Sequence, residues 1–264
     1  MTIFQNIVIS IVEGLTEFLP VSSTGHMIIA QKILGMESTE FIKAFTVNIQ
    51  FGAILSVIVL YWKRFFQTLD FYLKLLIGVL PALVIGFLLK DKIDSLLENV
   101  MVVAVMLVLG GIFMLFVDKW FNHPDANQEM DWKRSLKIGF FQCIAMIPGV
   151  SRSMATIVGG MSTKLTRKNA AEFSFFLAVP TMAAAAGYKL LKLVMNPQGA
   201  SMLSENLVAL LIGNVIAFLV AMAAIKFFIG FLTKHGFKAF GYYRIVVGLA
   251  IIIMSLLGID LDVL

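Results

Sequence analysis

The stretch that decides the fold covers residues 13–26 and reads EGLTEFLPVSSTGH. It interrupts the apolar segment Ile3–Leu34 with Pro20 and a run of polar side chains. The arm after His26 reaches only Gly35, and about eight residues make roughly 12 Å of helix, too short to cross a bilayer. We therefore predict a helical hairpin that enters the membrane and returns to the same side. Non-helical backbone at membrane depth needs protein or water to satisfy its polar groups, so this loop is expected to line a cavity.

The rest of the chain has the composition of an integral membrane protein. Of its 264 residues, 59% are hydrophobic and only 14% are charged, and the mean hydropathy is +0.93. A soluble domain carries about a quarter charged residues and could not bury this much apolar surface. Six further stretches are long and apolar enough, or nearly so, to cross a bilayer as helices. They are Ala44–Trp62, Tyr72–Leu89, Val100–Val117, Ala171–Leu190, Leu207–Leu232 and Ile245–Ile259.

A second broken apolar segment covers Ser135–Met161, where the break falls at Pro148-Gly149 and continues through Ser151-Arg152-Ser153. The order of hairpin, three spans, hairpin and three spans indicates an internal repeat, divided near the polar linker His123–Met130. We expect a single membrane domain over residues 1–264, with repeat one at about 1–120 and repeat two at about 131–264.

Weak sequence similarity links the two hairpins. Val21–Thr24 aligns with Val150–Ser153, and in that register Glu13 falls on Gln142. Because each repeat crosses the membrane three times, the second must enter from the opposite side. The predicted fold is thus an all-α integral membrane protein, an inverted-topology repeat with six spanning helices and two re-entrant helical hairpins. The functional site of such a repeat typically lies where broken helices meet near the midplane.

The charges predict an orientation rather than a nucleic-acid partner. The net charge is +5, but no basic run with interleaved aromatic residues indicates nucleic-acid binding. Twelve lysines and arginines, Arg244 among them, fall in predicted loops on one side, and six fall on the other. The richer side is expected to be cytoplasmic. The first hairpin then opens outward, and the second enters from the cytoplasm.

The first hairpin carries two carboxylates at membrane depth. Glu13 and Glu17 are four residues apart and share one helix face. Ionisable groups inside a membrane are costly and usually functional. Two close carboxylates favour either a bound divalent cation or a shared proton. The alternative is that both lie at a wet boundary and only solubilise the hairpin.

The loop that follows offers hydroxyls and an imidazole. Pro20 ends the first helix, and Ser22, Ser23 and Thr24 are candidate caps for the next one. Free backbone N–H groups and hydroxyls at a helix N-terminus suit an anion, although simple capping is the usual role of serine and threonine. His26 follows within one turn, where it is a candidate acid or base.

Arg152 supplies a cation in the break of the second hairpin. Its guanidinium stays charged, so at membrane depth it needs an anionic partner. That partner is either a carboxylate of the first hairpin or a phosphate clamped in bidentate fashion. Gly149 permits close backbone approach. Further hydroxyl donors are Ser151, Ser153 and Thr156. Together the two hairpins hold the groups that phosphoryl transfer or hydrolysis requires.

At its two motifs the chain resembles the bacterial undecaprenyl-diphosphate phosphatases, the bacitracin-resistance protein family. The first motif is residues 13–26, and the second, residues 148–156, reads PGVSRSMAT. The resemblance implies an enzyme of the bacterial inner membrane that removes the terminal phosphate of undecaprenyl diphosphate, which recycles the lipid carrier for peptidoglycan synthesis. It also implies a divalent cation, magnesium or calcium. The family's acidic pair, hydroxyl, histidine and arginine correspond to Glu13 and Glu17, Ser23, His26 and Arg152.

Two chemical routes and two other classes of protein stay open. Ser23 is a candidate nucleophile with His26 as its base, or water attacks directly with His26 or Glu17 as base. An inverted repeat is also a transporter design, so a transporter or flippase for a lipid phosphate or another anion is the alternative function. A channel or a non-catalytic lipid-binding scaffold is a third. The sequence leaves the oligomeric state open.

Overall fold

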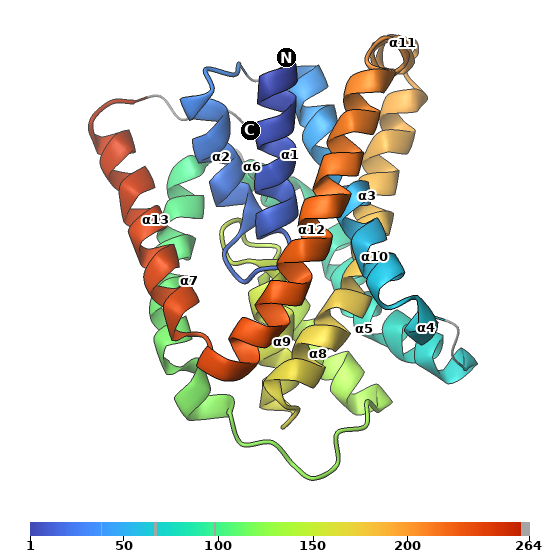
Figure 1. Ribbon diagram of the computed structural model, residues 1–264, viewed down its shortest axis with the longest axis vertical. Helices are drawn as coiled ribbons and strands as arrows, with labels where there is room; N and C mark the ends of the chain where they lie inside the picture. Colours follow the sequence, from blue (N-terminus) through green and yellow to red (C-terminus); the bar gives the residue numbers. More distant parts are fainter. Residues whose placement is uncertain (38, 66–67, 98, 260–264) are drawn as a thin grey trace.

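The computed structural model is helical in its described part, which covers residues 1–37, 39–65, 68–97 and 99–259 (Figure 1). In chain order the helices are α1 (Ile3–Thr16), α2 (Ser23–Ile33), α3 (Glu40–Leu60), α4 (Trp62–Phe65), α5 (Leu69–Leu88), α6 (Lys90–Leu97), α7 (Val100–Phe121), α8 (Trp132–Ile144), α9 (Arg152–Ser162), α10 (Arg167–Val194), α11 (Pro197–Glu205), α12 (Leu207–His235) and α13 (Lys238–Leu256). These residues contain no β-strand, which confirms the all-α prediction. Residues 260–264, the predicted end of repeat two, lie outside the described residues.

Six of the described helices are long and apolar enough to cross a membrane, and they coincide with the six predicted spans. They are α3, α5, α7, α10, α12 and α13. The prediction of a multi-pass membrane protein is confirmed. Helix ends differ from the predicted ones because helices continue into polar flanks, where side chains cap them. For example, α10 begins at Arg167 rather than Ala171, and the Thr166 hydroxyl accepts a hydrogen bond from the Asn169 N–H.

The beginning of α13 corrects one prediction. The sequence pattern places Arg244 in a loop, because the apolar run starts only at Ile245. In the structure α13 already begins at Lys238, and Arg244 lies inside the helix with 0% exposure. The prediction that Arg244 is a loop cation is therefore wrong. Backbone carbonyls that satisfy its guanidinium, described below, allow a charge to lie in the protein interior.

The non-helical part of each motif lies between two short helices, α1 and α2 for the first motif and α8 and α9 for the second. Figure 1 shows α1 running from one end of the molecule to its middle and α2 returning toward that end, while α8 and α9 lie in the opposite half. The helix pairs have the shape expected of the hairpins, and their re-entry into a membrane stays a prediction. α1 packs on α12, and α8 packs on α5, so each pair is supported by a long helix of the other half.

The two hairpin loops share an unusual backbone conformation at the residue before the returning helix. Ser22 has a φ of 69° and Ser151 a φ of 74°. The helices that follow, α2 and α9, have 11 residues each. A left-handed conformation in a residue other than glycine costs about 1–3 kcal/mol and persists only where its surroundings impose it. Ser22 and Ser151 are also the two residues that the predicted repeat alignment equates.

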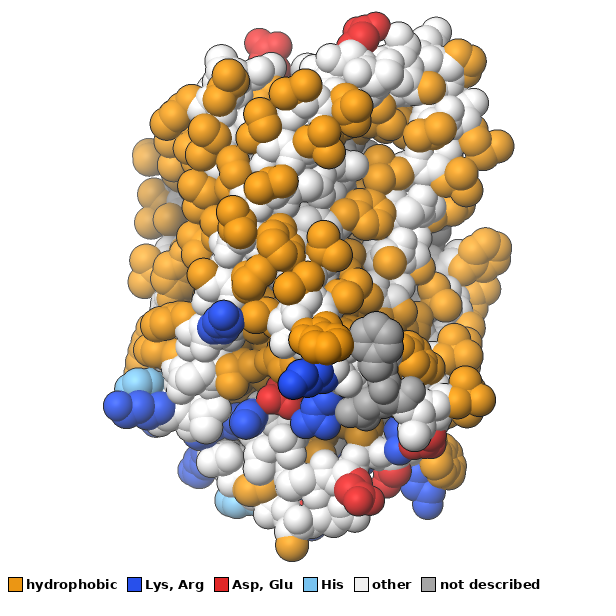
Figure 2. Space-filling view, turned by 45° about the vertical axis from the view of Figure 1, so that its right-hand side comes forward, with side chains coloured by type: hydrophobic (Ala, Val, Ile, Leu, Met, Phe, Trp, Pro, Cys, Tyr) orange, Lys and Arg blue, Asp and Glu red, His pale blue; other side chains and the backbone are white. Residues whose placement is uncertain are grey.

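The surface divides along the long axis of the molecule. Figure 2 shows hydrophobic side chains over most of its height and lysine and arginine side chains gathered at the lower end. The three tryptophans, Trp62, Trp120 and Trp132, are exposed, and each is next in sequence to a lysine. Exposed tryptophans next to a basic rim are typical of a membrane–water interface.

Candidate active site

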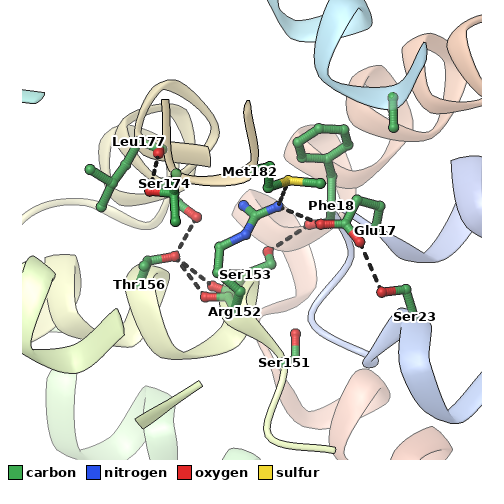
Figure 3. A network of polar contacts seen from close by, with 12 residues as sticks. Glu17, Phe18, Ser23, Ser151, Arg152, Ser153, Thr156, Ser174, Leu177 and Met182 are labelled. Atoms are coloured by element: carbon green, nitrogen blue, oxygen red, sulfur yellow. Dashed lines mark hydrogen bonds and ion pairs between the residues drawn. The ribbon is translucent and has the colours of Figure 1, made fainter. Parts of the chain in front are cut away.

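The two motif loops meet inside the molecule (Figure 3). Arg152, the first residue of α9, donates from Nη2 to Glu17 Oε1 at 2.7 Å, at the end of α1. The Ser153 hydroxyl donates to the backbone oxygen of Phe18 at 2.6 Å. Of the two arrangements predicted for Arg152, the structure contains the ion pair with a carboxylate of the first hairpin. The loops are therefore held together by one charged and one neutral hydrogen bond.

The Arg152 guanidinium is only partly satisfied by the protein. Its Nη2 also lies 3.0 Å from Met182 Sδ, and its Cζ lies 5.5 Å from the centre of the Phe18 ring. Its Nε and Nη1 are buried and have no hydrogen-bond partner among the described residues. A buried charged donor without a partner costs more than about 1–3 kcal/mol. These two nitrogens lie on different edges of the planar group, so each is free to donate to a separate anionic oxygen.

Glu17 connects this cation to a hydroxyl. Its Oε1 accepts from Arg152, and its Oε2 accepts from Ser23 Oγ at 2.8 Å. Ser23 is the first residue of α2, directly after the strained Ser22. A serine hydroxyl that donates to a carboxylate has a base in contact with its proton, which is the arrangement of an activated nucleophile.

Glu13 lies one helical turn before Glu17 and is 2% exposed, and its Oε1 is buried without a partner in the described part of the chain. The described residues hold no group of three or more His, Cys, Asp or Glu side chains suited to a metal. Magnesium needs no such cage, because it usually binds one or two carboxylates, water and the substrate's own phosphate oxygens. The pair Glu13 and Glu17 fits a divalent cation of this kind, since Glu13 Oε1 is free to coordinate it.

His26 makes two hydrogen bonds, and neither reaches Ser23. Its Nδ1 lies 2.8 Å from the backbone oxygen of Ser22, and its Nε2 lies 2.7 Å from Tyr243 Oη. A carbonyl oxygen only accepts, so Nδ1 carries the proton, and in the neutral ring Nε2 accepts from the Tyr243 hydroxyl. The structure thus pairs Ser23 with Glu17 rather than with His26, whose role as base stays a prediction.

The other predicted substrate-binding residues surround this network. The Thr156 hydroxyl lies 2.5 Å from Ser174 Oγ, and Ser153 contacts Phe18, so both hydroxyls have protein partners. Ser151 Oγ accepts from the Met154 N–H at 3.3 Å as the cap of α9. Ser22 is buried, and Thr24, like Ser23, is half-buried. The bonds of Ser151, Ser153 and Thr156 hold the start of α9 in place, and any contact of these residues with substrate stays a prediction.

The structure contains a cavity at the basic end of the molecule, away from the loops where the sequence predicts one. That cavity, of about 610 Å³, lies between α5, α10 and the linker after α7, and Arg64, Lys74, Glu129 and Glu172 are among its lining residues. No residue of either motif lines it. Arg152 and Glu17, which join the two loops, are largely buried, with side-chain exposures of 14% and 8%.

Sequence reasoning missed three contributors to the site: Met182, Tyr243 and Arg244. Tyr243 and Arg244 lie 217 and 224 positions from the residues of the first loop that they contact, and Met182 lies 30 positions from Arg152, so no local pattern reports these contacts. Arg244 also had no local signal, because a charge at the edge of an apolar run is ordinarily a loop or interface residue.

Gly149 gives a test of how tightly the second loop is packed. Its φ is +91°, and a Cβ at this position would lie 2.4 Å from the backbone oxygen of Val103. We expect Gly149→Ala to lower stability by several kcal/mol, since it adds a clash to a conformational cost of about 1–3 kcal/mol. The matched control is Gly35→Ala, with a φ of +60° and no atom within 4 Å of the added Cβ. Thermal unfolding in detergent measures both, and equal losses would contradict the predicted clash.

Comparisons with known proteins find similar chains over nearly the full length of this one. The family model described as bacitracin resistance protein BacA matches residues 6–250. The chain is 58% identical over its full length to an undecaprenyl-diphosphatase of Porphyromonas gingivalis, all of which it covers. It is 53% identical to one from Bdellovibrio bacteriovorus, over 99% of both chains. It is 45% identical to one from Aquifex aeolicus, over 94% of this chain and 97% of that protein.

Proposed function

The chain belongs to the bacitracin resistance protein BacA family, and from this premise we propose that its two motif loops are the active site of an undecaprenyl-diphosphate phosphatase. The chain is a multi-pass membrane enzyme that hydrolyses undecaprenyl diphosphate to undecaprenyl phosphate and inorganic phosphate. This reaction recycles the lipid carrier of peptidoglycan synthesis and confers bacitracin resistance.

One observation carries the assignment of the site. Arg152 presents two buried donors without partners, Nε and Nη1, beside the hydrogen bond between Ser23 and Glu17. A diphosphate brings several anionic oxygens, which supply the missing acceptors. Because Arg152 contacts Glu17 through Nη2 only, it binds a phosphate without releasing the carboxylate. The anion and the nucleophile are thereby brought together.

The proposed reaction proceeds through the serine. Ser23 Oγ attacks the terminal phosphorus and its proton passes to Glu17, while the bond from that phosphorus to the bridging oxygen breaks. Undecaprenyl phosphate leaves with the bonding electron pair, and Arg152 stabilises the charge that develops on the phosphate oxygens. Water then adds to the phosphorus of phosphoserine, the bond to Oγ breaks, and Glu17 returns the proton to Oγ, while both protons of the water leave on the inorganic phosphate. The second candidate is direct attack by water with Glu17 or His26 as base.

A divalent cation, magnesium or calcium, belongs to the proposal. Glu13 and Glu17 would hold it, and when bound it supplies positive charge to the phosphate oxygens. The two carboxylates support magnesium better than calcium, because calcium takes six to eight oxygen ligands and magnesium keeps several of its waters.

We also propose where the site lies. The basic end is expected to be cytoplasmic, in the inner membrane of a bacterium, which supports an outward-facing, periplasmic opening for the first hairpin. The polyprenyl tail is expected to leave between helices into lipid. A transporter or flippase is not favoured, because the full-length relatives are phosphatases by name and transport does not need a serine bonded to a carboxylate.

Phosphate release from undecaprenyl diphosphate by the purified protein in detergent tests the function. We expect release with magnesium, and loss of at least 90% of it with a chelator, because the metal offsets phosphate charge in the transition state. Adding magnesium back is the control and should restore the rate. No release under any of these conditions, from protein with an intact thermal transition, would overturn the phosphatase assignment in favour of lipid or anion transport.

A further inference from the structure

Arg244 on α13 is a buried cation without a carboxylate partner among the described residues. All three of its nitrogens donate to backbone carbonyls instead. The acceptors are Leu107 at 3.4 Å, Pro20 at 3.2 Å, Val150 at 2.9 Å, Met106 at 3.1 Å and Gly149 at 2.6 Å. Burying a guanidinium is costly, and packing of α13 against α7 needs only apolar side chains. The elements that supply these carbonyls therefore indicate the role of Arg244.

Leu107 and Met106 belong to α7, and the other three acceptors come from the two motif loops. Pro20 lies in the first loop, three residues before Ser23, and Gly149 lies in the second, three residues before Arg152. In the register that aligns the hairpins, Pro20 and Gly149 are equivalent positions. One planar guanidinium thus joins corresponding carbonyls of the two loops. Gly110 makes room for it, because a Cβ there would lie 2.4 Å from Arg244 Nη2.

The adjacent residue contacts the remaining predicted catalytic group. Tyr243 Oη lies 2.7 Å from His26 Nε2, and the two rings stack with their centres 5.4 Å apart and an interplanar angle of 12°. Because the Ser22 carbonyl holds His26 Nδ1, the tyrosine fixes the second nitrogen and hence the direction of the ring. Two consecutive residues of one helix therefore contact His26 and both loops.

We propose that Tyr243 and Arg244 form a third component of the active site, as positioning residues. Arg244 sets the distance between Ser23 and Arg152 through the loop carbonyls, and Tyr243 orients His26. Neither contacts substrate. The inference rests on the proposed phosphatase function and deepens it, since it adds α13 to a site that the motifs assign to the hairpins alone. Misplacing reacting groups by about 1 Å can cost about a hundredfold in rate.

Two substitutions test the proposal by steady-state phosphate release at saturating magnesium. Arg244→Lys keeps the charge but loses the planar fork, and we expect kcat to fall about a hundredfold with KM changed less than threefold. Tyr243→Phe removes one hydroxyl from a half-exposed ring, so folding is retained, and kcat is expected to fall about tenfold. The matched controls are Arg167→Lys, at the ion pair with Asp118, and Tyr242→Phe, an exposed neighbour. Both controls should keep wild-type kcat.

A double-mutant cycle separates positioning from a general structural role. If Tyr243 acts through His26, Tyr243→Phe has no further effect on kcat in a His26→Ala background. Equal effects in both backgrounds, or wild-type kcat in Tyr243→Phe, would overturn the role of Tyr243. Full kcat in folded Arg244→Lys would overturn the role of Arg244. If that variant does not fold, the tyrosine cycle decides. Absence of release from the wild-type protein is a different result, which rejects the phosphatase function itself.

Discussion

Replacing Arg152 by alanine is expected to lower kcat/KM for undecaprenyl diphosphate by about a thousandfold, equivalent to about 4 kcal/mol of transition-state stabilisation. The variant loses the two unpartnered donors that the phosphate would occupy and the bond to Glu17. Arginines that stabilise phosphoryl transfer are worth about 10³–10⁵ in rate. Phosphate release by purified protein gives the value, with thermal unfolding run on the same sample.

Two further variants test whether the loss of activity is specific to the Arg152 guanidinium. Arg152→Lys keeps the charge without the fork, so we expect an intermediate loss of about ten- to a hundredfold. Arg167→Ala removes a different arginine with 18% side-chain exposure from its ion pair with Asp118, at the basic end, and should keep most activity per folded molecule. Activity of Arg152→Ala within tenfold of the wild type would refute the proposed phosphate contact.

Ser23→Ala is expected to lower kcat by about a thousandfold or more, because the proposed covalent step loses its nucleophile. In the wild type, acid quenching during turnover followed by mass spectrometry should find phosphate on Ser23. Ser204→Ala, on α11, removes an exposed hydroxyl that bonds only to a nearby carbonyl and serves as the control.

The nucleophile and its base form one unit in this proposal. Adding Glu17→Gln to Ser23→Ala should therefore cost little more than Ser23→Ala alone, because residues that act together are not additive. If Ser23→Ala keeps most activity and no phosphoserine is trapped, water is the nucleophile, and Glu17 becomes the candidate base for that water.

The spans and the broken hairpins could be predicted because their signals are local. A run of about 20 apolar residues or an interruption at Pro20 depends only on neighbouring positions. The short helices α4, α6 and α11 could not be predicted, because each has nine residues or fewer and no long apolar run. The start of α13 was predicted at Ile245 for the related reason that the preceding residues, Lys238–Arg244, contain two basic residues and a glycine and so do not form an apolar run.

The residues of the two motifs that form the site could be predicted from the sequence, but most contacts between them could not. The free-energy cost of an unpaired charge at membrane depth predicts that Arg152 needs an anionic partner. Glu17 was one of the two candidate carboxylates. The hydrogen bond between Ser23 and Glu17, six residues apart, depends on the turn at Ser22. The contacts of Tyr243 and Arg244 with the first hairpin join residues 217 and 224 positions apart. Only the tertiary structure determines such contacts, and a single sequence carries no record of them.

The ion pair between Glu17 and Arg152 joins residues 135 positions apart, and this separation has a consequence for biosynthesis. A ribosome that adds about 5–20 residues per second needs on the order of ten seconds to make the intervening chain. During that interval the first hairpin is present without its cation, and a carboxylate without a partner at membrane depth is costly. The nascent enzyme therefore completes its active site only when the second hairpin arrives, so ribosomes paused before residue 152 carry an inactive chain.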